Sequence, residues 1–293
     1  MADPLPPAAA GRNPIPAVAG IGLRFPHHAA FLAAHPPVGW VEVHSENYLS
    51  GEALSVLETV RADYPVSLHS VGLSLGSAEG IDRRHRARLG ELTARIEPGL
   101  VSEHLAWSAV DHDFLADLLP LPLTEESLAV VCRNVDAAQA ALGRRLLIEN
   151  PATYLQFGHS TIPESEFLGA LVAGTGCGLI CDVNNIIVSA TNHGWDSLRH
   201  LRALPVAAIG EFHLAGHGEA TGAAAPLLLD THDRPVAPSV WSLFETALAE
   251  IGLHPTLIEW DAAIPTLDRL LAEAATAADY LRRAKANDHD AAA

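Results

Sequence analysis

The chain has 293 residues, of which 49% are hydrophobic, and this suits one large domain or two small ones. Its formal net charge of −17 argues against duplex nucleic acid as a partner, because phosphate binding needs a basic surface. The sequence contains no uninterrupted apolar stretch of about 18 residues, so no membrane-spanning segment is expected.

The ends of the chain and its cysteines allow further predictions. Residues 1–16 are rich in proline and alanine and lack the basic start and apolar block of a signal peptide, so we expect a disordered lead-in there and a disordered tail at 286–293. Cys132, Cys177 and Cys181 form no disulfide or zinc pattern, and this odd count predicts reduced thiols and a cytoplasmic location. Cys177 and Cys181 adjoin an apolar run and are interpreted as small buried hydrophobes.

Short apolar runs alternate with helical segments along the whole chain. In chain order, the predicted strand and following helix of each pair are 18–23 and 28–34, 41–44 and 51–63, 66–69 and 82–96, 100–104 and a helix capped by Thr124, 145–149 and 163–172, 178–182 and 195–203, 207–214 and 239–251, and 256–259 and 265–285. Regular alternation of this kind predicts a parallel sheet, and eight such units predict a single (β/α)8 TIM barrel over residues 17–285.

The predicted strand at 178–182 ends in an acid, Asp182, that is followed by two carboxamides. A buried carboxylate at this position is costly unless it is hydrogen-bonded, paired or bound to a metal. We expect Asn184 and Asn185 to turn the chain here, and the following loop to carry Asn192 and His193.

Titratable side chains recur where the predicted strands end, which is where TIM barrels place their active sites. These residues are Glu42, His44, His69, Glu103, His104, Glu149, Asp182, His213, His217, Glu259 and Asp261, with Asp230 and His232 in the loop after the seventh strand. So many carboxylates would repel one another without a counter-charge, and Arg24 is the only obvious arginine at a strand. The pattern therefore predicts a metal site.

The ligand types limit which metal is expected. Imidazole and carboxylate groups without a thiolate favour iron, manganese or zinc over Cu(I) or an iron–sulfur cluster. The number of donors exceeds what a single ion needs, so we expect a multinuclear site with a bridging carboxylate, for which Glu149 and Asp182 are the natural candidates.

Seven short segments resemble one protein family. They are His-Ser-Val-Gly-Leu-Ser-Leu-Gly-Ser at 69–77, Ser-Glu-His-Leu-Ala-Trp at 102–107, Glu-Asn-Pro-Ala-Thr-Tyr at 149–154, Cys-Asp-Val-Asn-Asn at 181–185, Glu-Phe-His-Leu-Ala-Gly-His at 211–217, Asp-Thr-His-Asp at 230–233 and Ile-Glu-Trp-Asp at 258–261. In this order they resemble the DUF692 (UPF0276-like) family, the multinuclear non-heme iron-dependent oxidative enzymes. The resemblance runs from Gly20 to Leu281.

The resemblance implies a barrel that holds two or three iron ions and uses O2 to remodel a residue, usually cysteine, of a ribosomally synthesised precursor peptide. Carried over by motif, the implied iron ligands are His69, His104, Glu149, Asp182, His213, Asp230, His232 and Glu259. Asn184, Asn185 and His217 lie beside these ligands in the motifs. Asn47 belongs to a further family signature, where it either touches substrate or makes a structural hydrogen bond.

His217, Asn184 and Asn47 are the candidate catalytic residues outside the ligand set, with His217 or His193 as the proton shuttle. Because the barrel occupies nearly the whole chain, recognition of the precursor's leader is assigned to a separate partner protein. A bufferin-type maturase is the preferred subtype, since the chain is a stand-alone barrel.

Two other readings remain open. A divalent-metal barrel of the sugar-isomerase or apurinic-endonuclease type also lines its rim with Glu, Asp and His. The net charge weakens the endonuclease version, and the isomerase version would place a lysine near the metal, which no predicted strand end carries. The other reading, a metal-storage or scaffold protein, is disfavoured by the glycine loops and open polar groups of the rim.

Overall fold

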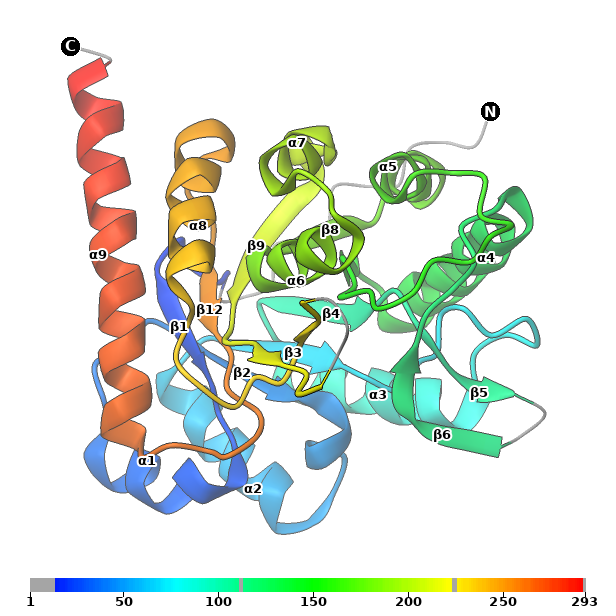
Figure 1. The fold of residues 1–293 in the computed structure, drawn as a ribbon. Helices are drawn as coiled ribbons and strands as arrows, with labels where there is room; N and C mark the ends of the chain where they lie inside the picture. Colours follow the sequence, from blue (N-terminus) through cyan, green and yellow to red (C-terminus); the bar gives the residue numbers. More distant parts are fainter. Residues whose placement is uncertain (1–13, 111–112, 223–225, 292–293) are drawn as a thin grey trace. The chain divides into compact units, whose positions relative to one another are not determined.

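The computed structural model describes residues 14–110, 113–222 and 226–291. Eight parallel strands form a closed barrel in the order β1-β12-β9-β8-β7-β4-β3-β2, which confirms the predicted TIM barrel (Figure 1). Residues 1–13 of the expected lead-in lie outside the described residues. In the described part of the chain, none of the helices has both the length and the apolar character needed to cross a bilayer.

The observed elements follow the predicted alternation of strand and helix. The barrel strands are β1 (Ala19–Gly22), β2 (Val41–His44), β3 (Val66–Ser70), β4 (Leu100–His104), β7 (Leu147–Glu149), β8 (Gly178–Asp182), β9 (Ile209–Leu214) and β12 (Thr256–Ile258). The α-helices are α1 (His28–Ala34), α2 (Gly51–Asp63), α3 (Arg83–Ile96), α4 (Glu125–Leu142), α5 (Glu164–Thr175), α6 (Val183–His193), α7 (Ser197–Ala203), α8 (Pro238–Ile251) and α9 (Leu267–Ala291). Short 3-10 turns are η1 (Phe25–His27), η2 (Ser45–Tyr48) and η3 (Val206–Ala208).

The chain packs in two compact units. The first unit includes Val43–Glu149 and Gln156–Leu179, and the second comprises Pro16–Glu42, Asn150–Leu155 and Ile180–Ala293. In the first unit, β4 pairs with β3 on one side and with β7 on the other. In the second unit, β12 pairs with β1 and β9 in the same way. Each unit therefore contributes a block of parallel strands with its own strand ends.

Side chains of the first unit anchor the loop between β3 and α3. The buried Asn134 of α4 donates to the carbonyl oxygens of Leu75 and Ser77 at 2.8 and 2.9 Å. Helix α4 begins with the predicted cap at Thr124, whose Oγ1 accepts from the backbone N–H of Ser127 while the Ser127 hydroxyl accepts from the backbone N–H of Thr124. The long loop that leaves β3, the strand of the predicted ligand His69, is thus held by a helix whose own start is well defined.

The turn predicted after Asp182 is wrong, because the chain continues directly into α6. The Asp182 side chain caps this helix by accepting from the backbone N–H of Asn185 at 2.6 Å. Asn184 and Asn185 therefore lie in the first helical turn, and His193 ends the helix before Gly194, whose φ is 70°. Asparagine favours both turns and the first turn of a helix, and here the capping hydrogen bond to the Asp182 side chain favours the helix.

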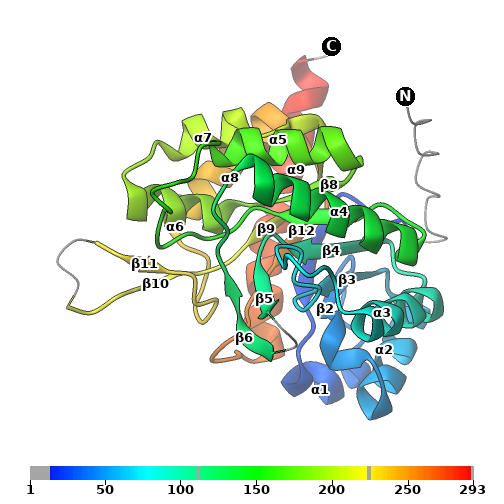
Figure 2. The same cartoon turned by 90° about the vertical axis from the view of Figure 1, so that its right-hand side faces the viewer.

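Two antiparallel hairpins were not predicted. The first, in the first unit, pairs β5 (Trp107–Val110) with β6 (Asp113–Leu119). The other, in the second unit, pairs β10 (Gly218–Glu219) with β11 (Leu228–Leu229), as Figure 2 shows. Each one follows a barrel strand that carries predicted metal ligands, β4 in the first case and β9 in the second.

Helix α9 ends at Ala291, and the disordered tail expected at 286–293 stays a prediction.

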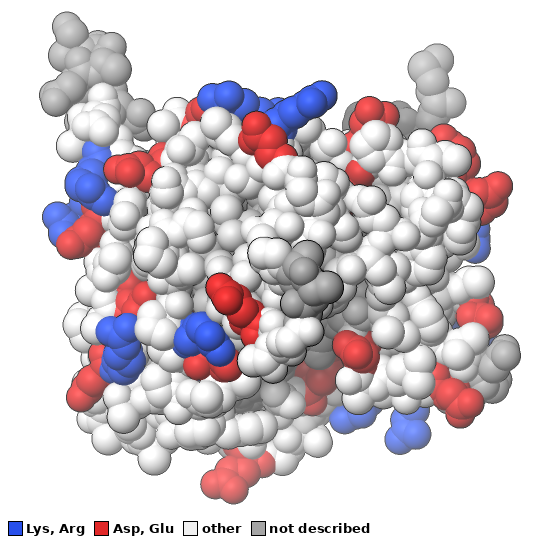
Figure 3. Space-filling view, in the orientation of Figure 1, with Lys and Arg blue, Asp and Glu red and all other residues white. Residues whose placement is uncertain are grey.

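Charged side chains are scattered over the face drawn in Figure 3, where acidic and basic residues are interspersed among uncharged ones. In the described part of the chain, this face offers no continuous basic stripe of the kind that nucleic-acid phosphates require.

Candidate metal centre

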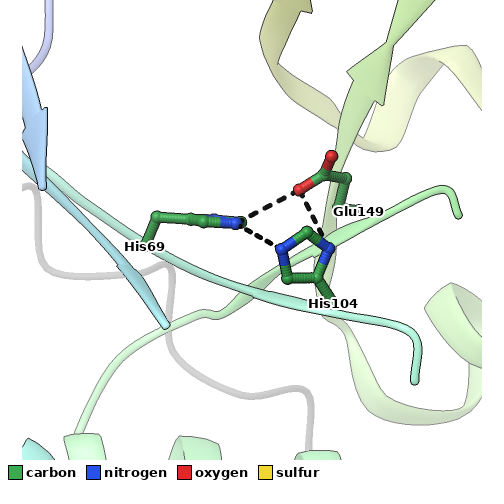
Figure 4. Close-up of side chains that lie close together, drawn as sticks. All are labelled: His69, His104 and Glu149. Atoms are coloured by element: carbon green, nitrogen blue, oxygen red, sulfur yellow. Dashed lines mark hydrogen bonds and ion pairs between the residues drawn. The ribbon is translucent and has the colours of Figure 1, made fainter. Parts of the chain in front are cut away.

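Three adjacent strands of the first unit bring His69, His104 and Glu149 together; we call these residues the first cluster (Figure 4). His104 and Glu149 are register partners of β4 and β7, and His69 lies opposite Ser102 of β4. The Oε2 atom of Glu149 lies 3.3 Å from Nε2 of His69 and 3.4 Å from Nδ1 of His104, and the two Nε2 atoms are 2.8 Å apart. The side chains of His69 and Glu149 are buried, and that of His104 is 16% exposed.

The first cluster can accommodate a shared metal ion to which His104 gives one of its two ring nitrogens, because one donor atom from each of the three residues lies within 4.8 Å of the other two. Two ligands that each lie about 2.1 Å from one ion are about 3.0 Å apart at right angles and about 3.4 Å apart at tetrahedral angles. Ser102 Oγ lies 2.8 Å from Nδ1 of His69. A hydrogen bond at Nδ1 fixes the ring and directs Nε2 toward the other donors, which is how metal-ligating histidines are usually held.

The second unit collects five other predicted ligands, Asp182, His213, Asp230, His232 and Glu259, which we call the second cluster. Oε2 of Glu259 lies 3.4 Å from Nδ1 of His213 and 3.5 Å from Nδ1 of His232. Nε2 of His232 lies 2.6 Å from Oδ1 of Asp230. Asp182 and His213 are fully buried, and Asp182 Oδ2 has no hydrogen-bond partner in the described part of the chain.

The buried carboxylates of the second cluster require neutralisation by protons or by cations. Burial and then the neighbouring Asp230 raise the pKa of Asp182 to about 7, although His213 and His232 act in the opposite direction. Burial lowers the pKa of His232, but Asp230 and Glu259 outweigh it and the pKa is raised well above its usual value. The cluster therefore takes up protons where no cation is present, and the same donors fit a metal ion.

The loop that supplies Asp230 and His232 has a constrained backbone. His232 has a φ of 44°, a left-handed conformation that is uncommon for a residue other than glycine. Its N–H donates to the carbonyl of Gly216 at 3.0 Å, and its own carbonyl accepts from Asp261 at 2.8 Å. A Cβ atom at Gly216 would lie 2.3 Å from the carbonyl oxygen of Arg234, so only glycine fits there. These contacts hold His232 in a conformation that costs energy, as is common at functional sites.

A hydrogen-bonded chain joins His217 to the second cluster through Asn184. The Asn184 amide nitrogen donates to Oδ1 of Asp230 at 2.6 Å, and its Oδ1 lies 2.7 Å from Nδ1 of His217. Since the amide oxygen can only accept, Nδ1 of His217 carries the proton and Nε2 is left as an acceptor in the neutral ring. Burial lowers the pKa of His217, which favours that neutral form.

Glu42 and Glu211 lie beside His213 in the second unit, and neither is in the predicted ligand set. Nε2 of His213 lies 3.5 Å from Oε1 of Glu211 and 3.7 Å from Oε2 of Glu42, and all three side chains are fully buried. Burial and the charge of Glu42 raise the pKa of Glu211 to about 8. Glu211 was missed although it stands two positions before His213 in β9, a spacing that puts both on the same face of the strand.

Arg24 is the counter-charge of the second unit. Its Nε donates to Oδ1 of Asp261 at 2.6 Å, and its terminal nitrogen lies 3.8 Å from Glu259. Burial opposes ionisation of Arg24, yet Asp261, Glu259 and Glu42 outweigh burial and raise its pKa. One arginine thus faces several carboxylates and balances only part of their negative charge. Cations at the second cluster would balance the rest.

Several predicted residues lie elsewhere. Asn47 is exposed in η2 and is outside both clusters. Glu103 is buried, and its two carboxylate oxygens accept from the backbone N–H groups of His104 and Leu73, both at 2.9 Å. His193 Nε2 lies 2.9 Å from Thr153 Oγ1. The buried Cys177 and Cys181 agree with their predicted role as small hydrophobes, and burial raises the pKa of each.

The closed barrel with buried clusters of imidazole and carboxylate defines a TIM-barrel protein with candidate metal sites. Residues 18–282 match the family model described as "RiPP precursor modification enzyme MbnB/TglH/ChrH". The chain belongs to this family of enzymes that modify ribosomally synthesised peptide precursors, the family that its sequence motifs resemble.

Curated relatives support the same assignment. UPF0276 protein RB0508 of Rhizobium meliloti (strain 1021) is 48% identical over 269 residues, which cover 90% of this chain and 87% of the relative. UPF0276 protein AM1_3026 of Acaryochloris marina (strain MBIC 11017) is 49% identical over 264 residues, which cover 90% of this chain and 94% of the relative.

Solved structures share the fold at low sequence identity. A xylose isomerase-like TIM-barrel protein from Mycobacterium smegmatis, in complex with magnesium, has a TM-score of 0.59 at 14% identity and covers 91% of this chain and 97% of that chain. D-psicose 3-epimerase from Clostridium cellulolyticum H10 has a TM-score of 0.58 at 12% identity and covers 91% of this chain and 99% of that chain. Identities this low establish the barrel architecture alone.

Proposed function

We propose that this protein is an iron-dependent oxidative enzyme that uses O2 to modify a residue, most often cysteine, of a ribosomally synthesised precursor peptide. Electrons would leave the peptide residue and pass to O2. The observation that carries the proposal is the first cluster, where two imidazoles and a carboxylate each place one donor atom within 4.8 Å of the other two. Family membership supplies the class of substrate.

The donor set is compatible with iron. Imidazole and carboxylate ligands suit iron, manganese and zinc, whereas a copper(I) site would use soft sulfur ligands. The first cluster would hold one ion and the second cluster one or two, which makes two or three per chain. Bound iron would supply one-electron and O2 chemistry. That Glu149 or Asp182 bridges two ions stays a prediction.

Residues of the chain itself would orient the site and handle protons. Ser102 fixes the ring of His69, and Asp182 is held by the N-terminus of α6. His217 would accept or release a proton at Nε2, because Asn184 engages its Nδ1. Asn47, which is exposed, would contact the peptide outside the buried clusters. A separate partner protein would present the leader of the precursor.

The test combines metal analysis with peptide mass. The protein is purified without O2 and its metals are counted, and it is then co-expressed with the short cysteine-containing reading frames that neighbour its gene. We expect two or three iron ions per chain and an O2-dependent mass change on one peptide. His104→Ala should abolish the mass change, while the matched control His159→Ala, at an exposed position, should retain it.

Two results would contradict the proposal. A single zinc or manganese ion with no iron would favour the divalent-metal isomerase or hydrolase reading. Modification at full rate by the purified enzyme alone would contradict the requirement for a partner protein.

A further inference from the structure

Two glutamates of the second unit lie beside His213 in the interior of the barrel. Glu211 and His213 are two positions apart in β9. The ring of Phe212, which lies between them, packs edge-on against Phe244 of α8. Since alternate side chains of a strand point to opposite faces, Glu211 and His213 face away from this helix and into the barrel. Glu42 of β2 reaches the same place, and we call Glu42, Glu211 and His213 the inner group.

Carboxylates are exceptional at such positions. The interior of an eight-stranded parallel barrel is normally filled by branched apolar side chains such as valine, isoleucine and leucine. All three side chains of the inner group are fully buried, and ionised carboxylates this deep are costly unless positive charge lies among them. Arg24 acts on Glu42, but its charge is shared with Asp261 and Glu259. It is therefore a counter-charge for several acids and not for the inner group alone.

The same nitrogen of His213 faces both glutamates. Its Nε2 lies 3.5 Å from Oε1 of Glu211 and 3.7 Å from Oε2 of Glu42. Both separations exceed the roughly 2.7–3.2 Å of an N–H···O hydrogen bond. Two ligands that each lie about 2.1 Å from one ion are about 3.0–4.2 Å apart, depending on the angle between them. One donor atom from each residue of the inner group lies within 4.8 Å of the other two, as a shared cation requires.

Glu211 points independently to a bound cation. Both of its carboxylate oxygens are buried, and neither makes a hydrogen bond within the described part of the chain. Buried carboxylate oxygens are usually hydrogen-bonded, paired or bound to a metal. Glu103, a buried acid of the first unit, shows the ordinary arrangement, since its two oxygens accept from the backbone N–H groups of His104 and Leu73.

We propose that Glu42, Glu211 and Nε2 of His213 bind a divalent transition-metal ion, which we call the inner ion. With Nε2 bound to the metal, Nδ1 of His213 carries the proton and faces Oε2 of Glu259 at 3.4 Å. His213 thus remains a metal ligand, but of the inner ion. The other four residues of the second cluster remain for the ions assigned to that cluster.

The donor set limits the kind of ion. The inner group offers at most four carboxylate oxygens and one imidazole nitrogen. Calcium takes about six to eight oxygen ligands, and magnesium usually keeps several waters. Imidazole together with carboxylate suits Mn2+, Fe2+ or Zn2+. Because the three side chains are closed to solvent, the inner ion would neutralise the interior of the barrel and would not contact a peptide.

The direct test locates the ion. The full-length protein is stripped of metal with a chelator, reloaded with Mn2+ alone and crystallised, and anomalous diffraction is recorded at the manganese edge. We expect a peak at coordination distance from Nε2 of His213 and from both glutamates. The absence of a peak at this position, whether or not Mn2+ binds elsewhere, would overturn the proposal.

Matched variants test the same site in solution. Glu211→Gln keeps the size of the side chain and should lower the total divalent metal by one ion per chain, measured by elemental analysis, and Glu42→Gln should do the same. The exposed Glu91→Gln is the control and should keep the full metal content. Combining Glu211→Gln with His104→Ala should remove two ions, because the inner group and the first cluster share no residue.

Full metal content in both glutamine variants of the inner group would overturn the proposal, since the two acids would then share a proton and hold no ion. If neither variant folds, the manganese-loaded crystal of the unaltered protein decides.

The inner ion does not depend on the proposed function, and the two can fail separately. Mn2+ at the inner group of a protein that never modifies a peptide would support the inner ion and contradict the oxidative function. O2-dependent peptide modification by a Glu211→Gln variant with full metal content would do the reverse.

Discussion

The two candidate metal clusters differ in how much charge they must balance. The first cluster has one carboxylate and two imidazoles, and its His104 is 16% exposed. The second cluster has three carboxylates and two imidazoles, and Glu42 and Glu211 lie fully buried beside it. Its deep acids hold protons more tightly than usual, as the pKa of about 7 for Asp182 shows. The first cluster is thus identified by the convergence of its donor atoms, and the second by the negative charge of its buried carboxylates.

This difference indicates different consequences of metal loss. Removing an ion from the first cluster leaves a small group whose members can hydrogen-bond to one another. Removing ions from the second leaves buried carboxylates that Arg24 only partly neutralises, so protons must replace the cations. We therefore expect the first cluster to control activity and the second to control both activity and stability.

The largest effect is expected from removing a donor of the first cluster. His104→Ala should lower the metal content by one ion per chain and reduce peptide modification by more than about a hundredfold, the upper end of the loss seen when an outer partner of a metal ligand is removed. Elemental analysis and peptide mass measure the two effects. If the variant keeps its full metal content, His104 is not a ligand.

Removing Arg24 probes the second cluster. Arg24→Met should destabilise the protein by about 3–5 kcal/mol, because it leaves Asp261 and Glu259 without their counter-charge in a buried environment. Denaturant unfolding with and without added iron is the measurement, and iron should restore part of the loss. Arg202→Met, which breaks only an exposed pair with Glu250, is the control and should change stability little. Equal effects of the two substitutions would contradict the electrostatic account.

Proton handling at the edge of the second cluster should be separable from metal binding. His217→Gln should lower the modification rate about a hundredfold at unchanged metal content, since proton transfer by one side chain contributes on that scale. Because burial lowers the pKa of His217, the wild-type rate should decline only at a pH below the usual titration range of histidine. Loss of metal in the variant would point to a ligand role instead.

The smallest effect concerns Glu211 in the metal-free protein. Its pKa is raised from 4.5 to about 8, so the folded chain binds more protons than the unfolded chain across that interval. Stability should therefore fall as the pH rises through this interval, and Glu211→Gln should remove that part of the decline. Thermal unfolding would register the difference as about 2–4 °C for each kcal/mol. Parallel pH curves for the two proteins would contradict the buried-acid interpretation.

The fold and most of the candidate site could be predicted because both depend on local patterns. Apolar runs that end in His, Glu or Asp identified the barrel strands, and the rule that barrel sites lie at strand ends indicated the candidate ligands. The structure brings His69, His104 and Glu149 together in the first unit and His213, His232, Asp230 and Glu259 in the second.

The missed features depend on packing that a local pattern does not specify. Helix α6 begins because Asp182 caps it, yet the same carboxylate next to two asparagines also reads as a turn. Strand β6 is exposed along nearly its whole length, so it lacks the alternation of a half-buried strand. Glu211 was hidden inside a strand, and only the approach of Glu42 and His213 gives it a role.

The most direct test of the central claim is Mössbauer spectroscopy with metal counting on the protein reconstituted anaerobically with 57Fe. We expect two or three iron ions per chain in at least two distinguishable environments, and His104→Ala should remove one environment while the other persists. A single iron environment that His104→Ala leaves unchanged, or a protein that binds one zinc or manganese ion and no iron, would contradict it.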